Sequence, residues 1–388
     1  MQIAFKKINI NAPFPTTQCG HSCQTYLVNE FKDDLFCRVV GFKDQDKWIL
    51  HLSMDLLAFN SDCRLKLQQE IRKAYNNNNI DLITSATHTH YANSVRNDTY
   101  PDWLLTKLVT EIKNMEYQDY ENVKVSYQRV PCQVVGKSRI SNYETNNEML
   151  SLVRFYNNND NFLNLIIHNC HPTILEAHTK FFSSEYVGAT LRNLEEKHPD
   201  INFTYMQGAS GDISSRFVRS GQQYENVLEA GKKLANEVEK LMSQEADKKS
   251  LSISYDKKYM DFIFDYAPLD TSNLRSDLTE RELETIKLGA IEREKILAKK
   301  SEIFSDEAKK VEIGILDLTA LKIVFFPNEI FSEYMNYLNL DKVMLVSYSN
   351  GYGPYVLPID FPYITYEMFT DTLSKQSKHE LIELLKTI

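Results

Sequence analysis

Four of the nine histidines occur as two close pairs, each at the end of a predicted strand. His88 and His90 follow the apolar run Ile80–Ala86, and His168 and His171 follow a second run. Side chains two residues apart on an extended strand point to the same face, so His88 and His90 can enter one cavity. Imidazole is a common zinc ligand, and a catalytic zinc site uses about three protein ligands. Two pairs favour a metal site, with His168 the weaker candidate because a position within the strand suits packing.

A loop rich in small residues follows the predicted strand at residues 201–206. Small side chains let a ligand approach the backbone, and the loop ends in an Asp-x-Ser motif, Asp212 and Ser214, which we expect to be exposed. A phosphate-binding P-loop is excluded because no Gly-Lys-Ser/Thr follows. The loop is also one residue short of a Gly-x-Ser-x-Gly nucleophile elbow. Gly351 and Gly353 lack the third glycine of a dinucleotide-binding motif.

Polar side chains also follow the last apolar strands. Glu329 comes just after an apolar run and a proline, where helix N-capping would explain it as well as a functional role would. Tyr352 and Tyr355 lie on a Gly-rich loop, and tyrosines in such loops usually pack. Their interpretation therefore depends on the rest of the chain.

The overall composition is that of an acidic folded protein. The 388 residues contain 44 Lys+Arg and 53 Asp+Glu, a net charge of −9. This balance argues against a nucleic-acid-binding surface that covers the whole protein and against a polybasic membrane anchor, and it leaves a local basic patch open. No run of about 18 apolar residues could span a membrane, and the N-terminus lacks the apolar core of a secretory signal. The six cysteines are scattered. We therefore expect a cytoplasmic protein with reduced thiols and no nucleic-acid partner.

One short segment, Cys19-Gly20-His21-Ser22-Cys23, has the residue types of a metal site. Its spacing is not typical of a zinc finger, and no second cysteine pair follows. Buried or loop thiols are therefore the favoured interpretation.

Hydrophobic periodicity predicts alternating strands and helices. Strands are predicted at residues 48–52, 80–86, 123–135, 149–155, 162–167, 201–206, 311–318, 321–326 and 343–346. Helices are predicted at residues 62–75, 103–115, 186–198, 224–242, 278–303 and 378–388. The helix from residue 278 is rich in Glu, Lys and Arg, which favours a solvated face. We expect one α/β domain over residues 1–388, with mixed β-sheets flanked by helices and a charged helical insertion near 265–310.

Taken in order, the motifs resemble the catalytic N-terminal domain of the neutral/alkaline non-lysosomal ceramidases. The resemblance spans roughly residues 10 to 388 and rests on His88-Thr89-His90, Cys170-His171-Pro172-Thr173, Gly208-Ala209-Ser210-Gly211-Asp212-Ile213-Ser214, Pro327-Asn328-Glu329-Ile330-Phe331 and Asn350-Gly351-Tyr352-Gly353-Pro354-Tyr355. No single motif is decisive, but five in the right order argue against a chance match.

The resemblance implies a ceramidase-like fold and a zinc-dependent amidase that cleaves an N-acyl bond in a small-molecule substrate. It also implies the zinc ligands His88, His171, Glu329 and Tyr352, with Tyr355 a near neighbour that could replace Tyr352. Two imidazoles, a carboxylate and a phenolic oxygen suit zinc, which lowers the pKa of bound water to about 7.

The remaining site residues are assigned around that metal. The family's serine and arginine map to Ser214 and Arg139, and Asp212 belongs to the same catalytic group. We expect Ser214 to act either as the nucleophile or as a hydrogen-bond donor to the tetrahedral intermediate. We expect His90 to transfer a proton or to stabilise the oxyanion. Arg139 suits a polar or anionic substrate group. Substrate contacts are expected from Tyr355, His21 and Arg216, since His21 lies where the family has a Gly-rich turn and Arg216 brings charge close to the site.

Several positions depart from the family's pattern. Tyr91-Ala92-Asn93-Ser94 stands where the family has a Ser-Gly-Pro loop after His-Thr-His. Ser215-Arg216 stands where the family has a proline after the serine that corresponds to Ser214. The sequence reaches Ile388, and we expect neither the family's C-terminal β-sandwich domain nor an export signal. We therefore expect a shorter intracellular relative that hydrolyses an amide other than ceramide, by metal-activated water or by serine attack. The alternatives are a non-catalytic relative that binds a ligand or partner, and a zinc-dependent esterase or phosphoesterase, which Arg139 and Arg216 would suit.

Overall fold

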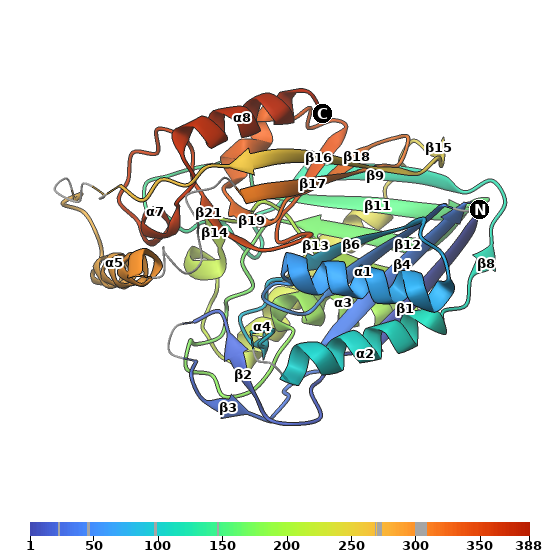
Figure 1. Cartoon of the computed structure of the whole chain (residues 1–388), viewed down its shortest axis with the longest axis horizontal. Helices are drawn as coiled ribbons and strands as arrows, with labels where there is room; N and C mark the ends of the chain where they lie inside the picture. The colour runs from blue at the N-terminus through green and yellow to red at the C-terminus, as the bar shows by residue number, and fades with distance from the viewer. Residues whose placement is uncertain are drawn as a thin grey trace.

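The computed structural model describes residues 1–388 except 22, 23, 45, 46, 97, 98, 146, 268, 270–273 and 299–308. These residues form a mixed α/β fold in which several β-sheets are flanked by helices (Figure 1). The predicted fold class is therefore confirmed. None of the helices in the described part of the chain is long and apolar enough to cross a membrane.

The first sheet has the strand order β6-β5-β4-β1-β8. Its strands are β1 (Gln2–Asn9), β4 (Phe36–Asp44), β5 (Lys47–Met54), β6 (Ile80–Ala86) and β8 (Gln118–Asp119). Helix α1 (Ser61–Tyr75) connects β5 to β6, which lets these two strands run parallel. Asn60 caps the start of α1 by accepting a hydrogen bond from the main-chain N–H of Cys63. Helix α2 (Thr99–Lys113) lies beside α1 (Figure 1).

The second sheet has the order β13-β12-β11-β9-β15. Its strands are β9 (Lys124–Pro131), β11 (Met149–Asn157), β12 (Asp160–His168), β13 (Asn202–Gln207) and β15 (Lys249–Ser250). Helix α3 (Glu185–Lys197) makes the crossover between the parallel strands β12 and β13. Helix α4 (Tyr224–Met242) packs against α3 at Gly231, where a Cβ atom would lie 2.4 Å from that of Ala189.

The third sheet has the order β16-β17-β18-β20. Its strands are β16 (Ser254–Phe262), β17 (Lys309–Asp317), β18 (Lys322–Phe325) and β20 (Val343–Val346), the last two parallel. The short elements are β2 (Thr16–Cys19), β3 (Leu27–Val28), β7 (Ala92–Asn93), β10 (Lys137–Ser138), β14 (Ile213–Ser214), β19 (Asn328–Ile330), β21 (Gly353–Val356), η1 (Ser215–Phe217) and η2 (Ser332–Tyr337). The remaining helices are α5 (Glu280–Ala298), α7 (Tyr366–Thr370) and α8 (Lys375–Lys386).

The parallel edges of the three sheets meet where their strands end. The N–H of Ala86, at the end of β6, donates to Tyr348 O at 3.1 Å, and Asn350 N–H donates to Thr84 O at 2.8 Å. The N–H of Ser347 donates to Gln207 O, at the end of β13, at 2.8 Å. The loops that follow β6, β13 and β20 therefore share one edge, where ligands bind in open α/β sheets.

The predicted elements agree with the observed ones where their apolar pattern is strong. The helix predicted at 224–242 coincides with α4, and the strand predicted at 80–86 with β6. The strand predicted at 123–135 is shorter and ends at Pro131. The charged helix begins at Glu280, and its predicted end, with parts of the 265–310 insertion, lies outside the described residues. The sequence pattern missed β1, β4 and β16, in which charged residues interrupt the apolar alternation.

The cysteines agree with the predicted reduced thiols as far as they are described. Cys19, Cys37, Cys63, Cys132 and Cys170 are all free. Ser22 and Cys23 of the short cysteine segment lie outside the described residues.

Candidate active site

His88 lies in the loop that leaves β6 and has a left-handed backbone, with φ of 66°. This conformation is costly for a residue other than glycine, so the surroundings must hold it. The His88 N–H donates to Leu56 O at 2.9 Å, and its ring Nδ1 lies 2.7 Å from Leu57 O. Because a carbonyl only accepts, Nδ1 donates, and in the neutral tautomer that this contact selects the lone pair of Nε2 is free to bind a cation.

His171 follows β12 and is held in the same way. Its N–H donates to Ile213 O at 3.0 Å, and its Nδ1 donates to Ser210 O at 2.7 Å. Burial and the neighbouring Arg139 lower the pKa of His171 to about 4, so the ring is neutral near pH 7. Neutral imidazole with a free Nε2 is the form that ligates metals.

Glu329, in β19, brings a carboxylate between the two rings. Its Oε2 lies 3.2 Å from His171 Nε2 and 3.5 Å from His88 Nε2. Two Nε2 lone pairs and a carboxylate oxygen are all acceptors, so a cation between them satisfies the group. The donor set, two imidazoles and one carboxylate, fits zinc.

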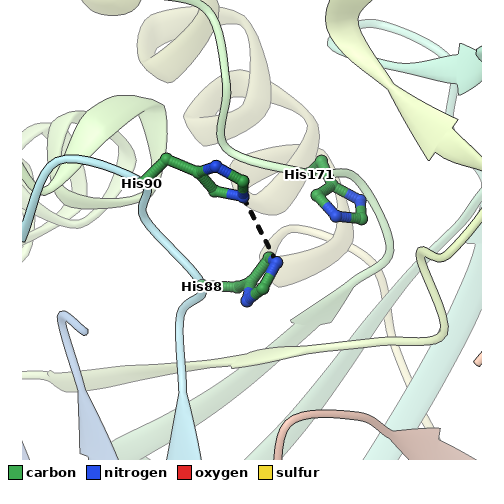
Figure 2. Close-up of side chains that lie close together, drawn as sticks. All are labelled: His88, His90 and His171. Atoms are coloured by element: carbon green, nitrogen blue, oxygen red, sulfur yellow. Dashed lines mark hydrogen bonds between the residues drawn. The ribbon is translucent and has the colours of Figure 1, made fainter. Parts of the chain in front are cut away.

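His90 completes a cluster of three imidazoles (Figure 2). Its Nε2 lies 3.3 Å from His88 Nε2, and the ligating atoms of His88, His90 and His171 all lie within 4.8 Å of one another. Unlike the other two rings, His90 has a buried Nδ1 without a hydrogen-bond partner among the described residues. The ring packs on Gly20 (φ 133°), where an added Cβ would lie 2.6 Å from it.

Three tyrosines surround the histidines. The hydroxyl of Tyr352 donates to Glu329 Oε1 at 2.6 Å, and that of Tyr355 lies 3.4 Å from His171 Nε2. Sequence reasoning missed Tyr348, whose ring stacks on His88 with centroids 3.7 Å apart and whose hydroxyl lies 3.1 Å from Ser210 Oγ. Tyr348 lies two residues after the end of β20, so the strand-end signal that selected the histidines could also have selected it.

The predicted Asp-x-Ser motif is not exposed, and that expectation is wrong. Asp212 is 0% exposed and Ser214 is 5% exposed, because β14 pairs with β10 and carries the motif into the interior. The Asp212 carboxylate accepts hydrogen bonds from the N–H and the hydroxyl of Ser332 at 2.7 and 2.8 Å. Burial raises the pKa of Asp212 to about 6. Asp212 therefore ties the serine loop to η2, while Ser214 lines the cavity described below.

Arg139 lies close to Ser214 and is already paired. Its guanidinium lies 2.7 Å from Glu367 Oε1, donates to Gly211 O at 2.7 Å and stands 5.2 Å from the ring centre of Tyr355. The pKa of Arg139 stays raised, because Glu367 and Tyr355 outweigh the effect of burial. Sequence reasoning assigned no role to Glu367, which neutralises Arg139.

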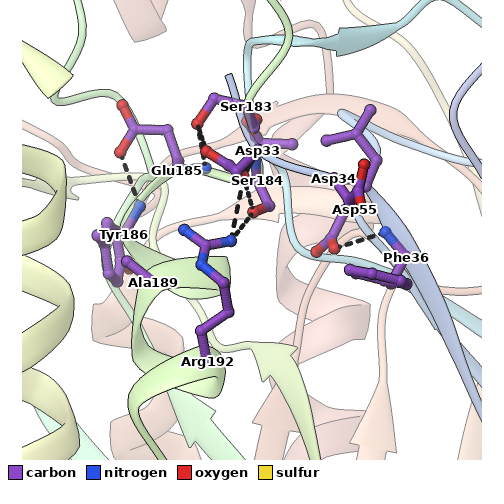
Figure 3. Close-up of polar contacts among 12 residues, drawn as sticks. Asp33, Asp34, Phe36, Asp55, Ser183, Ser184, Glu185, Tyr186, Ala189 and Arg192 are labelled. Carbon is purple, nitrogen blue, oxygen red and sulfur yellow. Dashed lines mark hydrogen bonds and ion pairs between the residues drawn. The ribbon is translucent and has the colours of Figure 1, made fainter. Parts of the chain in front are cut away.

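A polar network centred on Asp33 (Figure 3) is linked by a hydrogen bond to the loop that carries His88 and His90. The Asp33 carboxylate accepts hydrogen bonds from Ser183 Oγ at 2.7 Å and Ser184 N–H at 2.8 Å, and it pairs with Arg192 at 3.2 Å. The carbonyl oxygen of Ser183 in turn accepts a hydrogen bond from the hydroxyl of Thr89 at 2.8 Å. The network thereby fixes the residue between the two histidines.

Glu185 supports the second histidine loop. Its carboxylate accepts hydrogen bonds from the N–H groups of Ile174 and Leu175 at 2.7 and 2.8 Å, and of Tyr186 at 3.1 Å (Figure 3 shows the last). Burial raises the pKa of Glu185 to about 7. The chain just after His171 is therefore anchored by a buried carboxyl group.

A cavity of about 1040 Å³ opens over these residues. It is lined by His21, His90, Arg139, Ser214, Arg216, Glu329, Tyr352 and Tyr355, which are all among the predicted site residues. His21 also contacts Tyr91, its Nε2 lying 3.3 Å from the hydroxyl. Arg219 and Arg281, which sequence reasoning did not single out, also line the cavity. The cavity is large enough for an extended small molecule.

His168, the weaker histidine candidate, lies inside β12 and away from this cluster. Its Nδ1 donates to Met149 O at 2.8 Å, in agreement with a packing role.

Comparison with solved structures identifies the architecture. A neutral ceramidase from Pseudomonas aeruginosa superposes with a TM-score of 0.77 and 12% sequence identity, over 99% of this chain and 73% of that one. The fold is that of a neutral ceramidase. A ceramidase complexed with C2 gives the same TM-score and identity, over 99% of this chain and 74% of the other. No family model and no curated protein sequence matches the chain.

Proposed function

We propose that this protein is a zinc-dependent hydrolase that cleaves an N-acyl amide bond. The observation that carries the proposal is the convergence of His88 Nε2, His171 Nε2 and Glu329 Oε2, because Glu329 also lines the cavity that Ser214 lines. The ceramidase fold supports amide hydrolysis as the reaction class. Zinc, when bound, supplies Lewis acidity that polarises a carbonyl and lowers the pKa of water to about 7.

The chain's own residues hold that ion and position the substrate. His88, His171 and Glu329 provide the ligand atoms, and the carbonyls bonded to both Nδ1 atoms fix the ring orientations. Tyr352 orients the Glu329 carboxylate through its 2.6 Å hydrogen bond, and Tyr355 reaches the same centre from the His171 side.

His90 is proposed as the proton-transfer group rather than a further ligand. Ligating histidines almost always donate their second ring N–H to an acceptor, and His90 Nδ1 has no such partner among the described residues. Its Nε2 faces the centre within 3.3 Å of His88, within reach of a proton released there. Ser214 supplies a hydroxyl on the same cavity wall, for attack or for stabilising the oxyanion.

Hydrolysis of a panel of N-acyl amines and N-acyl amino acids tests the proposal. We expect turnover by the wild-type protein, and losses of about 100-fold or more in His171→Ala and Ser214→Ala. Lys232 is exposed on α4, so the variant Lys232→Gln serves as a control and should keep wild-type turnover. Hydrolysis of esters or phosphoesters without hydrolysis of amides would contradict the proposal and favour an esterase or phosphoesterase.

A non-catalytic ligand-binding role is the alternative from a different class. It predicts that Ser214→Ala and His90→Ala change neither turnover nor ligand affinity.

A further inference from the structure

The candidate cavity has an excess of cationic side chains, although the whole chain carries a net charge of −9. Among the described residues that line it, seven are Arg or Lys and four are Glu. The cationic ones are Arg96, Arg139, Arg216, Arg219, Arg275, Arg281 and Lys295. The carboxylates are Glu282, Glu292, Glu329 and Glu367.

The four carboxylates already have partners. Glu367 pairs with Arg139 at 2.7 Å, Glu292 with Lys295 at 2.7 Å and Glu282 with Arg275 at 3.6 Å. Glu329 faces the two histidines at 3.2 and 3.5 Å. Within the described part of the chain, no carboxylate therefore remains in the cavity lining to neutralise the other arginines.

Arg216, Arg219 and Arg281 all line the cavity. Arg216 and Arg219 lie in and just after η1, which begins next to Ser214, and Arg281 reaches the cavity from α5. Arg216 donates to Arg139 O at 3.2 Å, and Arg219 donates to Thr173 O at 2.7 Å. A guanidinium has five N–H donors, so these main-chain contacts leave most of them available.

Arg281 repels the guanidinium groups of both Arg216 and Arg219. Burial and the neighbouring Arg139 lower the pKa of Arg216 to about 10, and Arg281 adds to this effect. Burial and Arg281 also lower the pKa of Arg219. Glu367 and Glu282 offset the repulsion at Arg216 only in part, because both are paired elsewhere. A bound anion would relieve this repulsion and use the free donors.

The same cavity has an apolar wall. Leu278, Ile286, Leu288 and Ile296 of the α5 region line it, together with Tyr363 and Tyr366. An apolar chain can therefore lie along these side chains while a charged group meets the arginines.

We propose that Arg216, Arg219 and Arg281 form a subsite for an anionic group, a carboxylate or a phosphate, on the amine portion of an N-acyl amide substrate. This inference rests on the proposed amide hydrolysis and names the substrate class of that site. The acyl chain lies along the apolar wall, and the scissile amide lies between it and the arginines, next to Ser214.

Two probes that differ only in charge test the inference: N-lauroylglycine and its neutral amide, N-lauroylglycinamide. We expect the wild-type kcat/KM to favour N-lauroylglycine by about tenfold or more, and the preference to shrink with added salt. The double variant Arg216→Gln/Arg219→Gln should bring the ratio close to one, mainly through KM for N-lauroylglycine. Arg216→Lys/Arg219→Lys, which keeps the charge, should retain most of the preference, and Lys232→Gln should retain all of it.

N-lauroyl phosphoethanolamine serves as the phosphate-bearing substrate in the same comparison. A higher kcat/KM for it than for N-lauroylglycine identifies phosphate as the preferred anion, and the reverse identifies carboxylate; both support the subsite. Equal kcat/KM for N-lauroylglycine and its amide would overturn the inference while leaving amide hydrolysis intact.

If no amide is hydrolysed, the proposed function fails, and equilibrium binding of N-lauroylglycine decides the inference separately. Binding that is lost in the double glutamine variant supports the subsite, and binding that is equal in both proteins refutes it.

Discussion

Glu367→Gln removes the counter-charge of Arg139 with almost no change in side-chain shape. The two side chains are 8% and 12% exposed and lie 2.7 Å apart, so the pair is buried. Removing one partner of a buried pair leaves an uncompensated charge, which typically costs 3–5 kcal/mol. The glutamine oxygen still accepts one hydrogen bond, and so we expect the free energy of unfolding to fall by about 3 kcal/mol, the lower end of that range.

Urea denaturation of the metal-free protein measures this loss without any contribution from a bound ion. Glu111→Gln is the matched control. Its partner Lys6 lies 2.8 Å away, but the side chains are 35% and 27% exposed, and such surface pairs contribute about 0–1 kcal/mol. The double variant Arg139→Gln/Glu367→Gln should be more stable than Glu367→Gln, because it no longer buries a lone charge. Equal losses in Glu367→Gln and Glu111→Gln would refute the view that Glu367 neutralises Arg139.

Two further predictions concern His51, a buried residue of β5, and Tyr348. Burial lowers the pKa of His51 to about 3, so between about pH 3 and pH 6.5 the unfolded state binds a proton that the folded state does not. The free energy of unfolding therefore falls as the pH decreases through this window. In His51→Gln, the slope of the unfolding free energy against pH, measured near pH 5, should be smaller than in the wild type by about 1.4 kcal/mol per pH unit. An unchanged slope would show that His51 is not buried in its neutral form. Tyr348→Ala should weaken zinc affinity by about tenfold in chelator competition, because it removes the ring stacked 3.7 Å from His88, whereas Tyr348→Phe keeps the ring and should weaken it less. Equal affinity in the alanine variant and the wild type would show that the stack does not orient His88.

The apolar periodicity of the chain predicted the elements that position the site. The run ending at Ala86 predicted β6, and the hairpin of β11 and β12 followed from its alternation and its asparagine-rich turn. Strand ends then pointed to His88 and His171, because a parallel strand delivers its next residues to the edge of the sheet. These inferences needed only local pattern.

The contacts between distant segments had no such local signal. Glu367 follows Arg139 by more than two hundred residues, and only the packing of α7 beside the serine loop brings their charges together. The burial of Asp212 depends in the same way on Ser332, which η2 brings to the loop from the third sheet. Tyr348 was missed because a tyrosine after a strand most often packs, and its stack on His88 arises where the edges of two sheets meet.

The central claim is that His88, His171 and Glu329 hold a zinc ion that amide hydrolysis requires. The most direct test measures the metal content and the N-acyl amide turnover of one preparation, before and after chelation and during stepwise return of zinc. We predict one zinc ion per chain, turnover that rises in proportion to zinc content, and loss of both in His88→Ala and His171→Ala. Turnover that survives complete removal of the metal, or a purified protein that binds no divalent ion, would contradict the account.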